Sequence, residues 1–184
     1  MAINIPETGL WSTIASALNL NFASVEGATG YATYTDTQYT QANPLVITAG
    51  AVVNMPNNAS ISLSDQIPSG VASLYNGSRL VSNDARAAYI IRVGFTVSST
   101  SQTGAIGLVA DISTAGDGST PIINKSLALI RGANTPYPIV FSELYFSRET
   151  FVSNGAILLF ESITGDSSIY DISYVIAKVH KGRV

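Results

Sequence analysis

The stretch YIIRVGFTV, from Tyr89 to Val97, carries the alternating pattern that decides the fold class. Side chains two positions apart lie on the same face of an extended chain. One face therefore carries large apolar side chains, namely Tyr89, Ile91, Val93, Phe95 and Val97. The other face carries Ile90, Arg92, Gly94 and Thr96. We expect a strand whose first face lies in a core and whose second face meets water or a partner.

Short runs of strand-forming residues, separated by turn residues, continue on both sides of this strand. The expected strands are LVITAG at 45–50, AVVNMP at 51–56, ISLS at 61–64, AIGLVADI at 105–112, IINKSLALI at 122–130, PIVFSELYF at 138–146, AILLFES at 156–162 and a long strand at 169–180. Apolar residues occupy both faces of PIVFSELYF, which predicts a strand covered on both sides. No amphipathic helix separates the runs, so the pattern predicts an all-β fold, an antiparallel β-sandwich or jelly roll.

The last expected strand, Ile169 to His180, has two different faces. One face carries an aromatic and aliphatic stripe formed by Tyr170, Ile172, Tyr174 and Ile176. The other face alternates Asp171, Ser173, Val175, Ala177 and Val179. The stripe is either ordinary core or the contact with another subunit.

The N-terminal part of the chain differs from the strand region. GLWSTIASALNLNF, at 9–22, predicts a short helix with apolar residues at helical spacing. Its candidate anchor residues are Leu10, Trp11, Ile14, Leu18 and Phe22. So short a helix needs support, either from its own domain or from a neighbouring subunit or larger assembly. The Thr-rich and Tyr-rich stretch at 28–41 predicts an extended arm, so we expect helix and arm at 1–43 and a jelly-roll domain at 44–184.

Composition limits the classes of partner. The 184 residues, of 19.3 kDa, suit one domain, and only 11% of them are charged. A net charge of -3, with nine basic residues that form no cluster in the sequence, argues against nucleic acid as a partner. The sequence shows no signal-peptide pattern and no membrane-spanning run, so we expect a protein made in the cytoplasm, with no membrane partner.

Residues for chemistry are few. His180 is the single histidine and there is no cysteine, which excludes the usual zinc and copper sites. Glu143, Glu149 and Glu161 are candidate acids for glycoside hydrolysis, but chance pairs of carboxylates explain them better. The stretch from Asp111 to Asp117 resembles a calcium loop only loosely, because it lacks alternating oxygen ligands and a closing glutamate. We therefore expect no catalytic residue, no metal, no cofactor and no enzymatic activity.

Three stretches resemble a known family: AYIIRVGFTVSSTS, FSELYF and FVSNGAILLFESITGDSSIYDISYVIAKVHK. They are similar to the jelly-roll domains of phage virion proteins that share the shape of tumour-necrosis-factor and C1q heads. The resemblance covers about half of the chain, and the N-terminal stretches also resemble those of small phage structural proteins. It implies a homotrimer packed around a threefold axis with aromatic residues at the contact. The matching positions make Phe146, Tyr170, Ile172 and Tyr174 the candidate subunit interface.

Two functions follow from this resemblance, both on a virion surface. The first is a trimeric head decoration or cement protein, which binds the capsid protein through its helix and arm and braces the lattice. The second is a tail-fibre or receptor-binding head, whose loops hold a host surface glycan. Tyr75 and Tyr137 would then be the aromatic platforms on which a sugar stacks.

Overall fold

The computed structural model describes residues 28–56, 60–61, 65–130 and 132–182. The helix predicted at 9–22 lies outside these ranges, as do the anchor candidates Leu10, Trp11, Ile14, Leu18 and Phe22.

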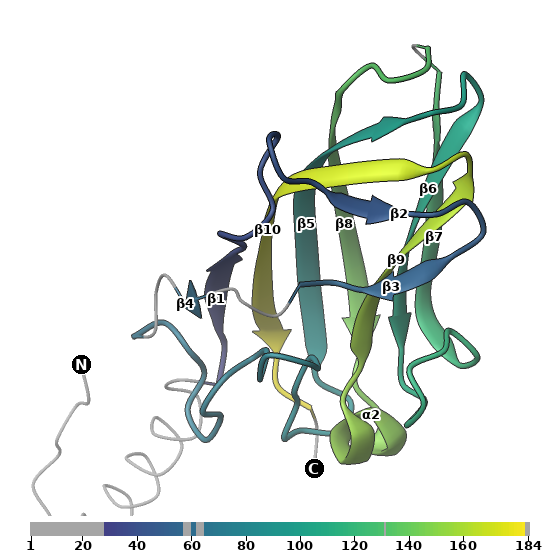
Figure 1. Cartoon of the computed structure of the whole chain (residues 1–184). Coiled ribbons are helices and arrows are strands. Elements are labelled where there is room, and N and C mark those ends of the chain that lie inside the picture. Colours follow the sequence, from purple (N-terminus) through teal and green to yellow (C-terminus); the bar gives the residue numbers. More distant parts are fainter. Residues whose placement is uncertain (1–27, 57–59, 62–64, 131, 183–184) are drawn as a thin grey trace, which may run out of the picture.

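Two antiparallel sheets pack face to face, and a short helix lies at one end of the sandwich (Figure 1). The elements are β1 (Gly30–Thr35), β2 (Leu45–Ile47), β3 (Val52–Asn54), β4 (Ser60–Ile61), β5 (Ala88–Ser99), β6 (Gly104–Asp111), β7 (Pro121–Leu129), β8 (Tyr137–Phe146), α2 (Glu149–Asn154), β9 (Ile157–Thr164) and β10 (Ser167–His180). The larger sheet has the order β4-β1-β10-β5-β8, with β2 also paired to β10. The smaller sheet has the order β3-β9-β6-β7. The predicted antiparallel sandwich is confirmed.

Strand β5 occupies the place that its alternation predicts. It pairs with β10 on one side and with β8 on the other, so it lies inside the larger sheet. Its side chains at Tyr89, Ile91, Val93, Phe95 and Val97 are all buried. Ile90 and Arg92, on the opposite face, are exposed. One face of β5 therefore belongs to the core and the other faces outward.

The expected arm is part of the sandwich. β1 pairs with β10 along its whole length, from Gly30 opposite Lys178 to Thr35 opposite Ser173. Ala32 and Tyr34 are buried in the core. Backbone hydrogen bonds and the burial of Tyr34 thus extend the domain to residue 30, whereas the sequence analysis began it at residue 44. Residues before β1 are left as the candidate attachment segment.

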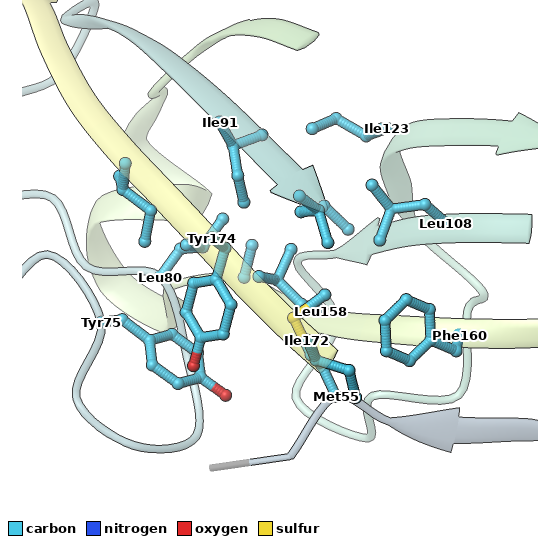
Figure 2. Close-up of a cluster of buried hydrophobic side chains, with 14 of the residues drawn as sticks. Met55, Tyr75, Leu80, Ile91, Leu108, Ile123, Leu158, Phe160, Ile172 and Tyr174 are labelled. Atoms are coloured by element: carbon cyan, nitrogen blue, oxygen red, sulfur yellow. The ribbon is translucent and has the colours of Figure 1, made fainter. Parts of the chain in front are cut away.

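Three tyrosines from distant parts of the chain form one packed cluster. Tyr34 and Tyr174 stack with their ring centroids 5.2 Å apart, and Tyr75 packs edge-on against both. The backbone N–H of Tyr75 donates to the Tyr34 hydroxyl at 3.0 Å. Figure 2 shows Tyr75 and Tyr174 beside the aliphatic core. Tyr75, a candidate sugar platform, is only 4% exposed and is part of the core.

A second aromatic cluster closes the end of the sandwich at α2. Tyr89 stacks on Tyr145 with their ring centroids 5.3 Å apart, and the ring of Phe151 lies 5.4 Å from that of Tyr145. Phe151 is the buried residue of α2. The helix is too short to be stable alone, so this contact holds it against the ends of β5 and β8.

Burial of these tyrosines predicts a loss of stability at alkaline pH. Desolvation raises the pKa of Tyr75 to about 12, and burial also raises the pKa of Tyr145 and Tyr174. An unfolded tyrosine titrates near pKa ~10, so above that pH the unfolded chain loses protons that the folded chain keeps. The free energy of unfolding should fall as the pH rises from about 10 to 12. Urea unfolding across this range measures it, and Tyr75→Phe should reduce the slope. Constant stability would contradict the prediction.

Candidate functional site

Exposed apolar side chains gather on the outward face of the larger sheet. The strand register places Tyr31 opposite Ala177, Ala177 opposite Ile90, and Ile90 opposite Leu144. These four residues form a continuous row across β1, β10, β5 and β8. Tyr31 and Ile90 are each 38% exposed, and Leu144 is 55% exposed. We call this face, with the row at its centre, the assembly face.

Strand β8 extends the assembly face to the edge of the sheet. Val140, Leu144 and Phe146 are 54%, 55% and 59% exposed. The sequence analysis expected both faces of this strand to be covered, but in the described chain only the inward face is. The physical reason is position: β8 is the last strand of the larger sheet, and the smaller sheet covers one side only. An edge strand with exposed apolar side chains invites contact with another chain.

The assembly face is uneven rather than flat. A hollow of about 260 Å³ lies where Gly94 provides no side chain, between Arg92, Val140 and Ser173. A second, more open hollow of about 460 Å³ lies beside Tyr31, and is also lined by Val175, Ala177 and Val179. Apolar side chains of another subunit could fill such hollows.

The assembly face carries little charge. Outward positions of β1, β10, β5 and β8 hold two formal charges within these described strands, those of Arg92 and Asp171. The remaining outward residues are apolar, tyrosine, glycine, proline, serine or threonine, with His180 at the end of β10. Burying this face against a partner therefore removes few charges from water, and the desolvation cost stays low.

The expected subunit interface is only partly on the surface. Phe146 lies on the assembly face, but Ile172 and Tyr174 are 0% and 1% exposed and Tyr170 is 7% exposed. The reason is the direction in which β10 alternates, because Ile172, Tyr174 and Ile176 point into the sandwich. A bulge between Tyr170 and Ser173 shifts the register, so Tyr170 lies opposite Thr96 on the outward side and is not part of the core cluster. Ile172 and Tyr174 therefore belong to the core and are not available to a neighbouring subunit.

Sequence reasoning left out three residues that form the row. Tyr31 was assigned to an arm, Leu144 to a covered strand, and Ile90 to a face of unknown contact. The alternation of β5 could have identified Ile90, because it placed this residue on the face of the strand that points away from the core. The pairing of β1 with β10 and of β8 with β5 gave no such local signal, since pairing is decided by contacts between distant segments.

The structure shows what surrounds each of the three candidate acids for glycoside hydrolysis. Glu143 lies 3.6 Å from the ammonium of Lys125, and this ion pair joins the edge strands β7 and β8. Glu149 is exposed at the start of α2, and Glu161 packs its side chain close to Gly107. Tyr137, the other candidate sugar platform, is half-buried at the start of β8.

Hydrogen bonds already occupy the carboxylate of the loosely calcium-like loop. Asp111 is fully buried, and its oxygens accept from the backbone N–H groups of Ser113, Gly118 and Thr120, each at 3.0 Å. These bonds outweigh burial and lower the pKa of Asp111. Arg79 donates to the carbonyls of Ser113 and Thr114 and so fixes the loop from outside. The loop is a hydrogen-bonded turn in which Asp111 serves as the central acceptor.

Two further properties of the described part of the chain concern metal binding and membrane crossing. Within it, no group of three or more histidine, cysteine, aspartate or glutamate residues lies close enough to hold a metal ion. Likewise, no helix in the described ranges has the length and apolar character needed to cross a membrane.

Comparisons with known proteins bear on the fold. No protein-family model matches the sequence, and no curated protein matches it. Eiger TNF from S. frugiperda is similar in structure, with a TM-score of 0.52 and 12% identity over 85% of this chain and 96% of that one. Vertex protein P5 of PRD1 aligns over 82% of this chain and 97% of its own, at 13% identity and a TM-score of 0.46.

A carbohydrate-binding module also aligns, more weakly. It is the C-terminal CBM6 of LamC from Zobellia galactanivorans, with 12% identity over 82% of this chain and 98% of that one, and a TM-score of 0.37. Of these three likenesses, that to Eiger TNF establishes the fold of this chain as a TNF-like jelly roll. The predicted resemblance is thereby confirmed in shape, and at such low identity a likeness of shape says nothing of function.

Proposed function

We propose that this TNF-like jelly-roll chain is a non-enzymatic virion structural protein, which forms a homotrimer and decorates or cements the capsid surface. The observation that carries the proposal is the assembly face, an apolar and nearly uncharged sheet surface that ends at an exposed edge strand. A face of this kind is an aggregation liability unless another subunit covers it.

Energetics favour covering the assembly face with a second copy of the chain. Burial of apolar surface gains about 25 cal/mol per Å², and a stable interface buries about 800 Å² on each partner. The row from Tyr31 to Leu144 supplies large side chains for such an interface, and the hollow at Gly94 supplies a place to receive one. The threefold arrangement itself comes from the resemblance to trimeric jelly-roll heads.

Attachment to the capsid is assigned to the segment before β1. Because β1 belongs to the sandwich, the anchor is limited to residues 1–27, which include Leu10, Trp11 and Ile14. Three copies of one weakly binding segment, held together by a trimer, would bind a symmetric capsid far more tightly than a single copy. The trimer and the anchor thus perform one function together.

Two measurements test this function. Light scattering after size exclusion should give a mass near three times 19.3 kDa for the full chain. Deleting residues 1–27 should leave that mass ratio intact but abolish co-sedimentation with capsids that lack this protein. A monomer at all concentrations would contradict the trimer, and capsid binding by the truncated chain would contradict the anchor.

A further inference from the structure

Basic residues that are scattered in the sequence gather at one end of the sandwich. Arg86 comes just before β5 and Arg148 just after β8, while His180 ends β10 and Lys181 follows it. The register brings these ends together, because Ala88 lies opposite both Phe146 and His180. Figure 1 shows α2 and the C-terminal end of β10 at this end. The sequence analysis found no basic cluster, and the tertiary structure forms one.

A pocket lies between the two arginines. It has a volume of about 440 Å³ and is lined by Arg86, Phe146, Ser147, Arg148 and Glu149. Both arginines are exposed, and neither is among the ion pairs of the described residues. The lining thus carries two arginine charges and the single carboxylate of Glu149, which leaves an excess of positive charge in a chain whose net charge is -3. A bound anion would compensate this excess.

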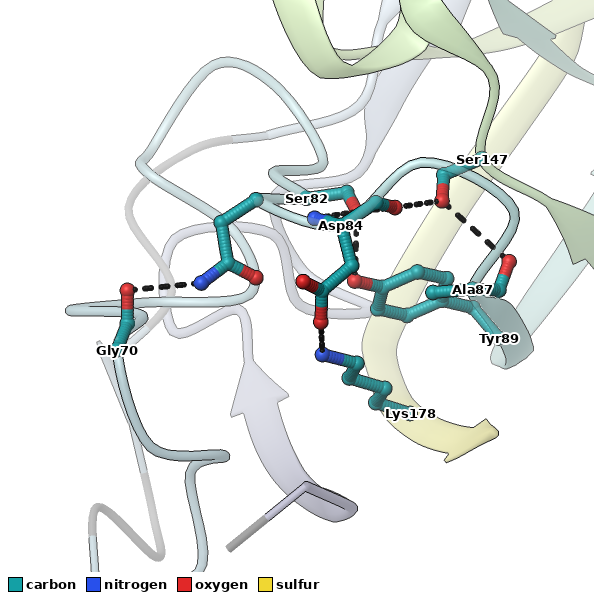
Figure 3. A network of polar contacts seen from close by, with 8 residues as sticks. Gly70, Ser82, Asp84, Ala87, Tyr89, Ser147 and Lys178 are labelled. Carbon is teal, nitrogen blue, oxygen red and sulfur yellow. Dashed lines mark hydrogen bonds and ion pairs between the residues drawn. The ribbon is translucent and has the colours of Figure 1, made fainter. Parts of the chain in front are cut away.

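The backbone around the pocket is held in place. The N–H of Arg86 donates to the carbonyl of Ser147, and the N–H of Ser147 donates to the carbonyl of Ala87 at 2.9 Å. The Ser147 hydroxyl donates to the carbonyl of Asp84, whose carboxylate pairs with the buried ammonium of Lys178 (Figure 3). The two arginines therefore start from fixed backbone positions, which lowers the entropy lost when a ligand binds.

Arg86 also has an uncommon conformation. Its φ of 63° lies in the left-handed region, which few residues other than glycine adopt. Such backbone strain persists where surrounding contacts enforce it and is frequent at binding sites. Here the hydrogen bond from Arg86 to Ser147 is the enforcing contact.

We propose that this pocket binds a carboxylated saccharide, such as a uronic acid unit of a surface polysaccharide. The planar guanidinium groups match a carboxylate, with two parallel hydrogen bonds from each arginine that engages it. The ring of Phe146, which is 59% exposed, offers an apolar face to the C–H groups of a sugar ring. Glu149 is an acceptor for sugar hydroxyl groups.

The four side chains Arg86, Phe146, Arg148 and Glu149 favour a carboxylated saccharide over simpler ligands. Inorganic phosphate would use the arginines but leave Phe146 without a role, and a neutral sugar would leave the excess positive charge of the lining uncompensated. An acidic peptide would bring its carboxylate but has no array of hydroxyl groups for Glu149. A saccharide that carries a carboxylate uses all four side chains.

The test compares carboxylated with neutral glycans on the full chain. An array of uronic-acid, sialic-acid and neutral oligosaccharides gives the first readout, and calorimetry with trigalacturonate and its methyl ester gives affinities. We expect binding of trigalacturonate, about tenfold or greater weakening with the methyl ester, and further weakening by salt. Equal binding of the ester, or no carboxylated glycan bound above the neutral ones, would overturn the proposal.

Variants locate the binding in this pocket. Arg86→Asn removes the charge while keeping a residue that tolerates left-handed backbone, and Arg148→Gln removes the other charge. Each should weaken trigalacturonate binding about tenfold, since each removes a charge-assisted contact. Lys125→Gln is the control, an exposed cation on β7 that lies outside both the pocket and the assembly face, and it should bind normally.

Further results with these variants and ligands would overturn or reassign the proposed binding. Wild-type affinity in both pocket variants would overturn the assignment, and equally tight binding of hexaglutamate would assign the pocket to an acidic peptide instead. If Arg86→Asn fails to fold by circular dichroism, Arg148→Gln alone decides. Light scattering of each variant separates this result from the trimer, because loss of glycan binding with an unchanged mass leaves the proposed function untouched.

Discussion

Replacing both Ile90 and Leu144 with glutamate should convert the proposed trimer to a folded monomer. The two residues lie opposite each other on β5 and β8 and are 38% and 55% exposed in the single chain. Their carboxylates would be hydrated in the monomer, so the sandwich should tolerate them. In the assembly they would lose that hydration at a cost of several kcal/mol per charge, which exceeds what a small interface supplies. Light scattering after size exclusion measures the change in mass.

Leu127→Glu is the matched control for this prediction. Leu127 is 43% exposed, similar to Leu144, but it lies on β7 in the smaller sheet. The control should keep the trimeric mass, and near-ultraviolet circular dichroism should show the same tertiary packing in both variants. If the double variant with Ile90→Glu and Leu144→Glu keeps the trimeric mass, the subunit interface does not lie on the assembly face. Dissociation of the control would show that any exposed apolar position is sensitive.

Asp84→Ala should cause a large loss of stability, because it leaves the buried Lys178 without its partner. The side chain of Lys178 is 2% exposed, and its ammonium pairs with the carboxylate of Asp84, whose side chain is 29% exposed (Figure 3). Removing the carboxylate leaves a buried positive charge without a partner, and such a change costs about 3 to 5 kcal/mol. Urea unfolding at one fixed protein concentration measures it, since assembly makes stability depend on concentration.

A double variant separates the effect of the unpaired charge on stability from the effect of lost packing. Lys178→Met combined with Asp84→Ala removes both charges and should return the free energy of unfolding to within about 1 kcal/mol of the wild type. Lys125→Met breaks the more exposed pair with Glu143 and should cost less than about 1 kcal/mol. If Asp84→Ala costs no more than Lys125→Met, the burial of Lys178 has little energetic consequence.

The two proposed surfaces lie next to each other on the molecule. Phe146 lies at the edge of the assembly face, outside the row, and also lines the pocket between Arg86 and Arg148, so the trimer contact must leave its ring uncovered for a sugar to bind. A trimer formed through the row from Tyr31 to Leu144 would place three copies of the pocket around one axis. Three weakly bound sugars on one polysaccharide would then combine into stable attachment. A decoration protein of this kind would bind the capsid with one end and a surface glycan with another.

Several features of the chain could be predicted from local pattern. Alternation in YIIRVGFTV identified a strand with one core face, because side chains two apart must share a face whatever the strand pairs with. Turn residues between the runs separated most of the other strands. The low content of charged residues indicated a surface of small polar groups. Each of these conclusions depends only on neighbours in the sequence.

The tertiary structure alone decided which faces are inside and which residues meet. Ile172 and Tyr174 could have faced either way, and they became core because the smaller sheet packs on that side of β10. A bulge in β10 places Tyr170 on the other side, opposite Thr96. Arg86 and Arg148 are 62 positions apart, and only the pairing of β5 with β8 brings them to one pocket. Local pattern fixes the period of a strand, whereas burial and proximity depend on contacts between segments that are distant in the chain.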